Sequence, residues 1–123
     1  MKADVAYLAY SNQEMAINLV DDYISKLKSR EPPCKESMKK EYAEWSSVKT
    51  AAETILERIL EGFNPVVVAE DYVSQMDYFS YKANESGNYE TSDMFAIESD
   101  TALDILQIFA DNDIHYEEEI YNE

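Results

Sequence analysis

Glycine, proline and cysteine are all scarce in this sequence of 123 residues, which contains two, three and one of them respectively. Few glycines and prolines leave little material for the tight turns of a β-sheet protein, and the many Ala, Glu, Lys, Leu and Ile residues favour helices. The single cysteine, Cys34, excludes an internal disulfide and is typical of a reducing compartment. The sequence contains no apolar run of the ~20 residues that span a membrane, and its N-terminal segment lacks the pattern of a signal peptide. We therefore expect a cytoplasmic, mainly helical protein.

Positive charge is almost absent from the second half of the chain. Residues 65–123 contain fifteen Asp and Glu residues and one cation, Lys82, whereas residues 1–64 contain eleven acids and nine Lys or Arg residues. The formal net charge of −16 therefore divides into about −2 and −14. Unbalanced charge destabilises a compact fold. Its concentration in one half of the chain therefore indicates that the negative electrostatic field of this half serves a function. The length predicts a single domain over 1–123, in which 65–123 is the acidic part and 1–64 is nearly neutral.

The nearly neutral part predicts two long helices separated by a pair of prolines. Residues 3–29 form one helix or two, because Ser11 begins an S-x-x-E capping box that would start a new helix. The prolines at 32–33 end this element, and a second helix is predicted over 35–61. Its apolar residues recur every three or four positions, as in a helix of a bundle, at Met38, Tyr42, Trp45, Ala52, Leu56, Ile59 and Phe63. We expect Trp45 to be largely buried against the first and fourth helices.

Two further helices are predicted in the acidic part. Asn64-Pro65 provides an N-cap and a first residue for a helix over 65–83. The inner face of this helix is predicted to contain Val68, Tyr72, Met76 and Phe79. A hairpin of strands through 84–88 is the alternative, because the valine run and the aromatic end of the segment also suit a strand. After a polar loop, the fourth helix is predicted over about 91–111.

The fourth helix separates an apolar face from an acidic one. At about 100° per residue, four apolar residues fall within a narrow arc: Phe95, Ala102, Leu106 and Phe109. Four carboxylates fall nearly opposite: Asp93, Asp100, Asp104 and Asp111. No Lys or Arg lies on this acidic face. The spacing predicts a line of exposed negative charges, whose mutual repulsion the packing of the inner face must overcome.

The tail at 112–123 has three interpretations: it extends the fourth helix, pairs as a short edge strand, or stays mobile. Its two tyrosines and two isoleucines favour docking on the bundle or on a partner, whereas its run of glutamates is typical of a solvated tail. The predicted fold class is mainly α, a bundle of about four helices. An α+β fold with a short C-terminal strand or hairpin is the alternative.

The sequence contains no pattern that predicts catalysis, a metal site or a cofactor. Cys34 and His115 are its sole cysteine and histidine, and a nucleophilic pair would also need an orienting group and an oxyanion site. Asp111-x-Asp113 resembles the opening of a calcium loop, but the central glycine and the closing glutamate are missing. A zinc site would need more nitrogen and sulfur ligands than the chain contains. We therefore predict a protein that is not an enzyme and needs no cofactor.

In size, acidity, content of ten tyrosines and lack of catalytic motifs, the chain resembles small acidic phage-type inhibitors of restriction or CRISPR nucleases. These anti-restriction and anti-CRISPR proteins, some of them helical, act as nucleic-acid mimics: they present carboxylates where the host enzyme binds phosphates. The resemblance is one of composition, and no motif carries functional residues over to this chain. It implies an inhibitor that occupies the basic nucleic-acid-binding groove of a DNA- or RNA-handling enzyme.

The charge itself predicts the kind of partner. An acidic surface attracts basic proteins and is repelled by nucleic acid and by anionic membranes. The candidate partner-binding residues are acids and tyrosines of the acidic part: Glu70, Asp77, Tyr81, Asp93, Asp100, Asp104, Asp111, Asp113, Tyr116, Glu117, Glu118 and Glu119. The alternative is a non-catalytic structural or regulatory helical module, as a monomer or a homodimer, whose acidity serves solubility. Salt-sensitive binding to a basic partner distinguishes the two.

Overall fold

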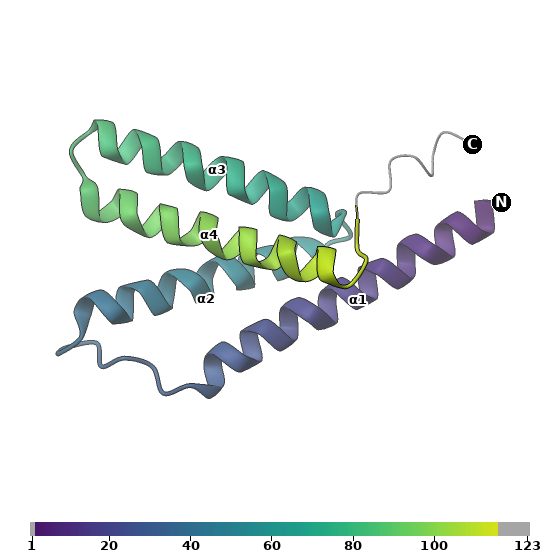
Figure 1. Ribbon diagram of the computed structural model, residues 1–123, viewed down its shortest axis with the longest axis horizontal. Coiled ribbons are helices and arrows are strands. Elements are labelled where there is room, and N and C mark those ends of the chain that lie inside the picture. The colour runs from purple at the N-terminus through teal and green to yellow at the C-terminus, as the bar shows by residue number, and fades with distance from the viewer. Residues whose placement is uncertain (1, 116–123) are drawn as a thin grey trace.

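Four helices make up the part of the chain that the computed structural model describes, residues 2–115, with side chains described from residue 12 onward. They pack side by side as a bundle (Figure 1): α1 (Lys2–Ser29), α2 (Lys39–Leu60), α3 (Pro65–Glu85) and α4 (Tyr89–Asp111). Residues 2–115 contain no strand. The predicted mainly α bundle is confirmed. The alternative of a strand hairpin is wrong, because α3 stays helical to Glu85 and the chain then turns within 86–88.

Local sequence signals set several of the helix boundaries. The side-chain oxygen of Asn64 accepts hydrogen bonds from the amides of Val66 and Val67 at 3.0 and 3.2 Å, so Asn64 caps α3 as predicted. Gly62 and Gly87 follow α2 and α3, with φ angles of 104° and 78°. These angles lie in the left-handed region that glycine adopts most easily, which lets the chain leave each helix sharply.

Of the two alternatives for residues 3–29, the structure has one continuous helix, α1, with Ser11 inside it. Two predicted boundaries need correction. α2 begins at Lys39, later than predicted, because residues 35–37 form a turn. α4 begins earlier than predicted, at Tyr89, directly after Asn88, whose side chain accepts a hydrogen bond from a first-turn amide.

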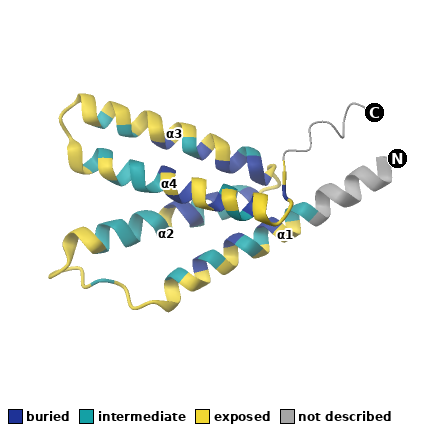
Figure 2. Ribbon diagram, in the orientation of Figure 1, coloured by how far each residue is buried: buried dark blue, intermediate teal, exposed yellow. Residues whose placement is uncertain are grey.

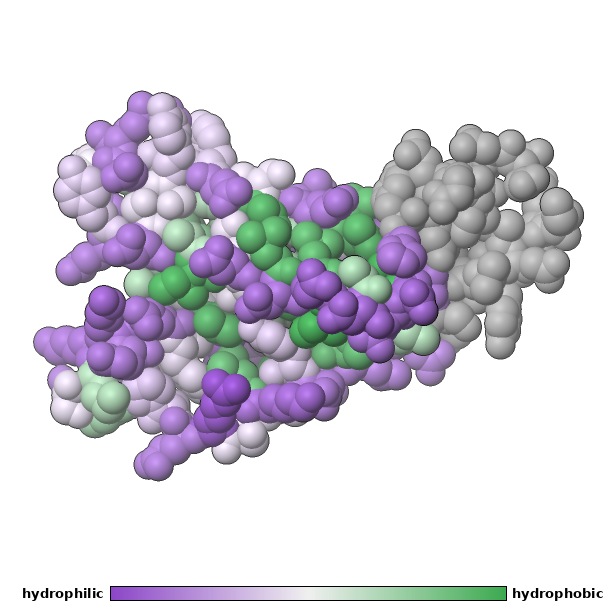
Figure 3. Space-filling view, viewed as in Figure 1, coloured by the Kyte–Doolittle hydropathy of each residue, from purple (hydrophilic) through white to green (hydrophobic). Residues whose placement is uncertain are grey.

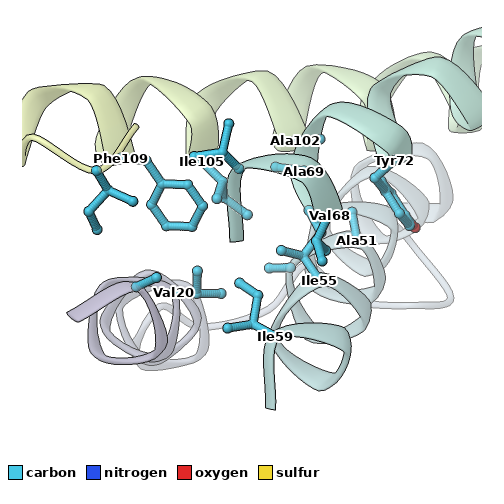
Figure 4. Packing of buried hydrophobic residues seen from close by; sticks show 14 of the residues in the cluster. Val20, Ala51, Ile55, Ile59, Val68, Ala69, Tyr72, Ala102, Ile105 and Phe109 are labelled. Carbon is cyan, nitrogen blue, oxygen red and sulfur yellow. The ribbon is translucent and has the colours of Figure 1, made fainter. Parts of the chain in front are cut away.

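One buried core joins all four helices (Figure 4). Its largest fully buried side chains are Phe109, Ile55, Ile59, Ile105 and Val20. Tyr72 of α3 is also buried, and so is Ile114, whose amide donates to the Phe109 carbonyl at 2.8 Å just after α4 ends. Burying a large apolar side chain stabilises a fold by about 1.5–3 kcal/mol. This core therefore fixes the position of α4 relative to the other helices.

Some apolar residues predicted to face the core are exposed. Met38 and Phe63 lie beyond the ends of α2 and are 44% and 58% exposed, so the packing seam of α2 is shorter than predicted. Phe79 of α3 is 42% exposed, because α3 packs mainly on α4 and little on α2. Its ring instead lies 5.4 Å from that of Phe95, measured between centroids. Trp45 is half-buried rather than largely buried, and its indole N–H is buried without an acceptor among the described residues.

The bundle is more tightly packed at one end than at the other. Lys28, one residue before the end of α1, forms an ion pair with Glu53 of α2 at 3.0 Å. The first turns of α2 extend beyond this contact. Residues 42–49 of α2 and 94–98 of α4 are all half-buried, and Figure 2 shows the buried residues concentrated toward the opposite end of the bundle.

Candidate acidic interaction surface

We call the four aspartates on the outer face of α4 the acidic row: Asp93, Asp100, Asp104 and Asp111. All four are exposed, whereas Ala102 and Phe109 on the opposite side of the helix are fully buried, and Phe95 and Leu106 pack partly buried against the core. The predicted exposure of these four residues is confirmed. At about 1.5 Å of rise per residue, the row extends over about 27 Å of α4.

No cation neutralises the acidic row within the described part of the chain, where the row takes part in no ion pair. Lys82, the one cation of the acidic part, instead pairs with Glu85 of its own helix at 3.6 Å. Asp111 accepts a hydrogen bond from the side chain of Gln107 at 2.9 Å, which leaves its charge in place. The row therefore presents its negative charges to solvent with no ion-pair partner among the described residues.

Tyr23 of α1 lies close enough to the acidic row to feel its field. Burial raises the pKa of this tyrosine above its ordinary value, and the negative charge of Asp104 raises it further, while Arg30 opposes the shift. Tyr23 is half-buried and packs against the core, and Asp104 is the one residue of the row whose charge acts on it. The sequence prediction missed this residue, because its place in the apolar stripe of α1 indicates a core role. Its nearness to α4 depends on how the two helices pack.

Asp77, predicted to be a binding residue, also holds α3 against α4. Its carboxylate accepts a hydrogen bond of 2.6 Å from the hydroxyl of Ser99, a buried residue of α4. One helical turn further along α3, the hydroxyl of Ser80 donates to the Ser92 carbonyl at 2.9 Å, and that of Ser92 donates to the Ser80 carbonyl at 2.8 Å. Asp77 thus has a structural contact that the sequence prediction did not include.

Glu98, unlike the acidic row, is an acid of α4 whose carboxylate is bonded to another helix. It is half-buried and accepts a hydrogen bond of 2.6 Å from the hydroxyl of Tyr72. Burial and this hydrogen bond raise the pKa of Tyr72 well above its ordinary value. The guanidinium of Arg58 lies 5.5 Å from the centre of the Tyr72 ring, and its positive charge opposes the rise in the pKa of Tyr72. Glu98 is thus bonded to a residue of the neighbouring helix α3, whereas the one hydrogen bond given for the acidic row joins Asp111 to Gln107 of its own helix.

The other predicted residues are spread over several places. Glu70 and Tyr81 are exposed on α3, and the Tyr81 hydroxyl donates to Glu85 at 3.1 Å. Asp113 is exposed just after α4, with a positive φ of 61° and its carboxylate 4.0 Å from His115. The remaining predictions lie outside the described residues: Tyr116, Glu117, Glu118 and Glu119. The structure therefore aligns the acidic row on one helix face and places the α3 residues on its neighbour.

The sole cysteine and histidine lie in separate parts of the molecule. Cys34 is exposed in the connection between α1 and α2, and hydrogen bonds from Ser37 lower the pKa of its thiol. His115 follows the end of α4, and Figure 1 shows these two segments apart from one another. A Cys–His pair is therefore not formed. Among the side chains of residues 12–115, no group of three or more His, Cys, Asp or Glu is arranged to hold a metal ion.

Comparison with protein-family models, with curated proteins and with solved structures finds no match for this chain. Among the helices described here, none is both long and apolar enough to cross a membrane.

Proposed function

We propose that this protein binds a basic surface on another protein through the acidic row, and that this surface is the nucleic-acid-binding groove of a DNA- or RNA-handling enzyme, which the protein inhibits by occupying it. One observation carries the proposal: four exposed carboxylates lie on one helix face with no cation paired to any of them among the described residues. Such a face attracts lysine and arginine side chains and steers a basic partner toward it.

The packing of α4 against the rest of the bundle supports this role. Ile105 and Phe109 are fully buried on its inner side, and hydrogen bonds from Ser80 and Ser99 tie it to α3. A surface held in place before binding loses little conformational entropy when the partner arrives. The carboxylates thus keep a fixed spacing, as phosphates do along a nucleic-acid strand.

The spacing also limits how many phosphates the row replaces. Duplex DNA carries one charge per about 1.7 Å of its axis, whereas the row has four charges over about 27 Å. We therefore expect the row to meet a few lysine or arginine side chains of the partner, with other acids of the acidic part adding to the field. Because charges exposed to solvent are screened over about 8 Å at physiological ionic strength, binding should weaken as salt is added.

The experiment compares two variants that each lose four negative charges. The first replaces Asp93, Asp100, Asp104 and Asp111 by Asn. The matched control replaces four exposed acids of the nearly neutral part, which form no ion pair in the described chain, by the corresponding amides: Asp21, Glu41, Glu57 and Glu61. Partners are captured from lysate at low salt and eluted with a salt gradient, and duplex DNA or RNA is then tested as a competitor.

We expect the unaltered protein and the control to retain a nucleic-acid enzyme that DNA or RNA displaces, and the row variant to lose it. The salt dependence of the remaining affinity should be flatter for the row variant. If no partner is retained, or if binding is indifferent to salt, to nucleic acid and to the row substitutions, the acidity serves solubility and the protein is a helical interaction module of another kind.

A further inference from the structure

A groove runs between the first turns of α2 and the first half of α4, at the loosely packed end of the bundle. It encloses about 890 Å³, which is within the range of sites that bind ligands. Ala43 of α2 and Met94 and Ile97 of α4 form its apolar floor, and all three are half-buried. Figure 3 shows apolar surface between the start of α4 and the start of α2 at this end of the molecule.

The groove lies at the end of the bundle where α2, α3 and α4 extend beyond α1 (Figure 1). Toward the other end, α1 covers α2 and α4 with buried residues such as Val20, and its last ion pair with α2 is that of Lys28 with Glu53. α2 continues from there back to Lys39, about 20 Å further at the helical rise of ~1.5 Å per residue. This end of the bundle thus has three helices and room for about three turns of another.

The two walls of the groove carry opposite charges. Lys39 and Lys40 lie on the α2 wall, together with Glu44, and Glu90 and Asp93 lie on the α4 wall. Among residues 12–115, neither lysine forms an ion pair, so neither is bound to an acid of the opposite wall. Two lysines at the N-terminal end of a helix are also unfavourable with respect to its dipole, which indicates that they serve something other than the stability of α2.

We propose that this groove binds a short amphipathic helix of another protein. The apolar side of that helix rests on Met94 and Ile97, a basic edge meets Glu90 and Asp93, and an acidic edge meets the two lysines. The opposite charges of the walls set the direction in which the helix lies, because reversing it would bring like charges together. A second copy of this chain is disfavoured as the occupant, because each copy brings a net charge of −16.

This inference goes beyond the proposed function, since the groove shares only Asp93 with the acidic row. The probe is a synthetic helix of about 12 residues with a leucine stripe, lysines along one edge and glutamates along the other. A side-chain staple holds it helical, because free helices of this length are marginal in water. Two control peptides keep the stripe and carry lysine on both edges or glutamate on both edges. Binding is measured by calorimetry, and the site is mapped by amide chemical shifts.

We expect the mixed-charge peptide to shift the amides of Ala43, Met94 and Ile97. Lys39→Glu combined with Lys40→Glu, both at exposed positions, should lower the affinity for the mixed-charge peptide about tenfold. The same variant should bind the all-lysine peptide no more weakly than the unaltered protein does. The triple substitution Asp100→Asn, Asp104→Asn and Asp111→Asn, which tests the proposed function separately, should change the affinity for the mixed-charge peptide less than about twofold.

Several outcomes would overturn the inference. The inference fails if the mixed-charge peptide binds no better than the all-glutamate peptide, if it shifts amides of the acidic row instead of those of the groove, or if its affinity is unchanged by the lysine substitutions. A dimer of the chain alone, seen by sedimentation equilibrium and dissociated by the same lysine substitutions, would assign the groove to a second copy instead.

Discussion

α2 and α4 are both amphipathic helices of the bundle, but they differ in whether their acidic side chains have cationic partners. Both have an apolar side in the core, with Ile55 and Phe109 fully buried. On the outer side of α2, Glu53 lies between two lysines, Lys28 at 3.0 Å and Lys49 at 3.8 Å. On α4 the acidic row has no such partner in the described chain. An amphipathic helix must place polar residues outside, but nothing in the fold requires them to be of one sign. The acidity of α4 is therefore separate from its role in the bundle.

The largest effect should come from the core that the two helices share. Phe109→Ala is expected to lower the free energy of unfolding by about 3–5 kcal/mol, and Ile55→Ala by about 2–5 kcal/mol, because each leaves a cavity among fully buried side chains. Urea denaturation followed by circular dichroism measures both. Leu103→Ala on α4, at a position 49% exposed, is the control and should cost much less. A small loss for Phe109→Ala would show that α4 is anchored less firmly than α2.

A smaller effect on stability should distinguish Glu98, which is hydrogen-bonded to Tyr72, from the exposed aspartates of the acidic row. Tyr72→Phe removes the hydroxyl that Glu98 accepts from, and leaving a partly buried carboxylate without this donor costs about 1–3 kcal/mol. Asp100→Asn, in the exposed row, has no such bond to lose and serves as the comparison.

The raised pKa of Tyr72 also predicts that the stability of the fold depends on pH. The pKa of Tyr72 is raised in the folded chain above the ordinary value of about 10, so between these two values the unfolded chain loses a proton that the folded chain keeps. The stabilisation is complete below about pH 10 and falls as the pH rises above it. Urea midpoints measured on either side of pH ~10 should fall less steeply for Tyr72→Phe than for the unaltered protein. Equal slopes would contradict the assignment.

The smallest effect on stability should come from the acidic row itself. Within the row, only Asp100 and Asp104 lie one helical turn apart, so replacing all four aspartates by Asn should stabilise the fold by a few tenths of a kcal/mol. Thermal unfolding at low salt measures the gain, which added salt should reduce. The control with amides at Asp21, Glu41, Glu57 and Glu61 should gain less, because cations are interspersed around them. A marked loss of stability in the row variant would mean that these carboxylates make contacts that support the fold.

The sequence predicts those parts of the fold that depend on neighbouring residues. The breaks at the proline pair and at Asn64 follow from backbone chemistry, and periodicity correctly assigns the two faces of α4. Exposed Phe79 and half-buried Trp45 were predicted less well, because their burial depends on which helix covers them. A periodic stripe shows which side of a helix is apolar, but it does not show how far along that side a partner extends.

The same distinction applies to the candidate site. The acidic row lies on one helix, so a spacing of about 3.6 residues per turn is enough to find it. Tyr23 and the bond between Ser99 and Asp77 join different helices, and no local pattern indicates them. The groove between α2 and α4 was not predicted, because the sequence placed the start of α2 at residue 35 and the position of the groove depends on where α1 ends.

α3 and α4 are joined by only three residues and pack on each other more extensively than any other two helices. Contacts that are near in sequence form quickly, because little chain entropy is lost in closing a short loop. We expect this helical hairpin to assemble early in folding, before α1 and α2 complete the core. That early step brings together ten acidic residues and a single cation, Lys82, before the cations of the other half are in place. Dissolved salt should therefore speed the folding of this chain.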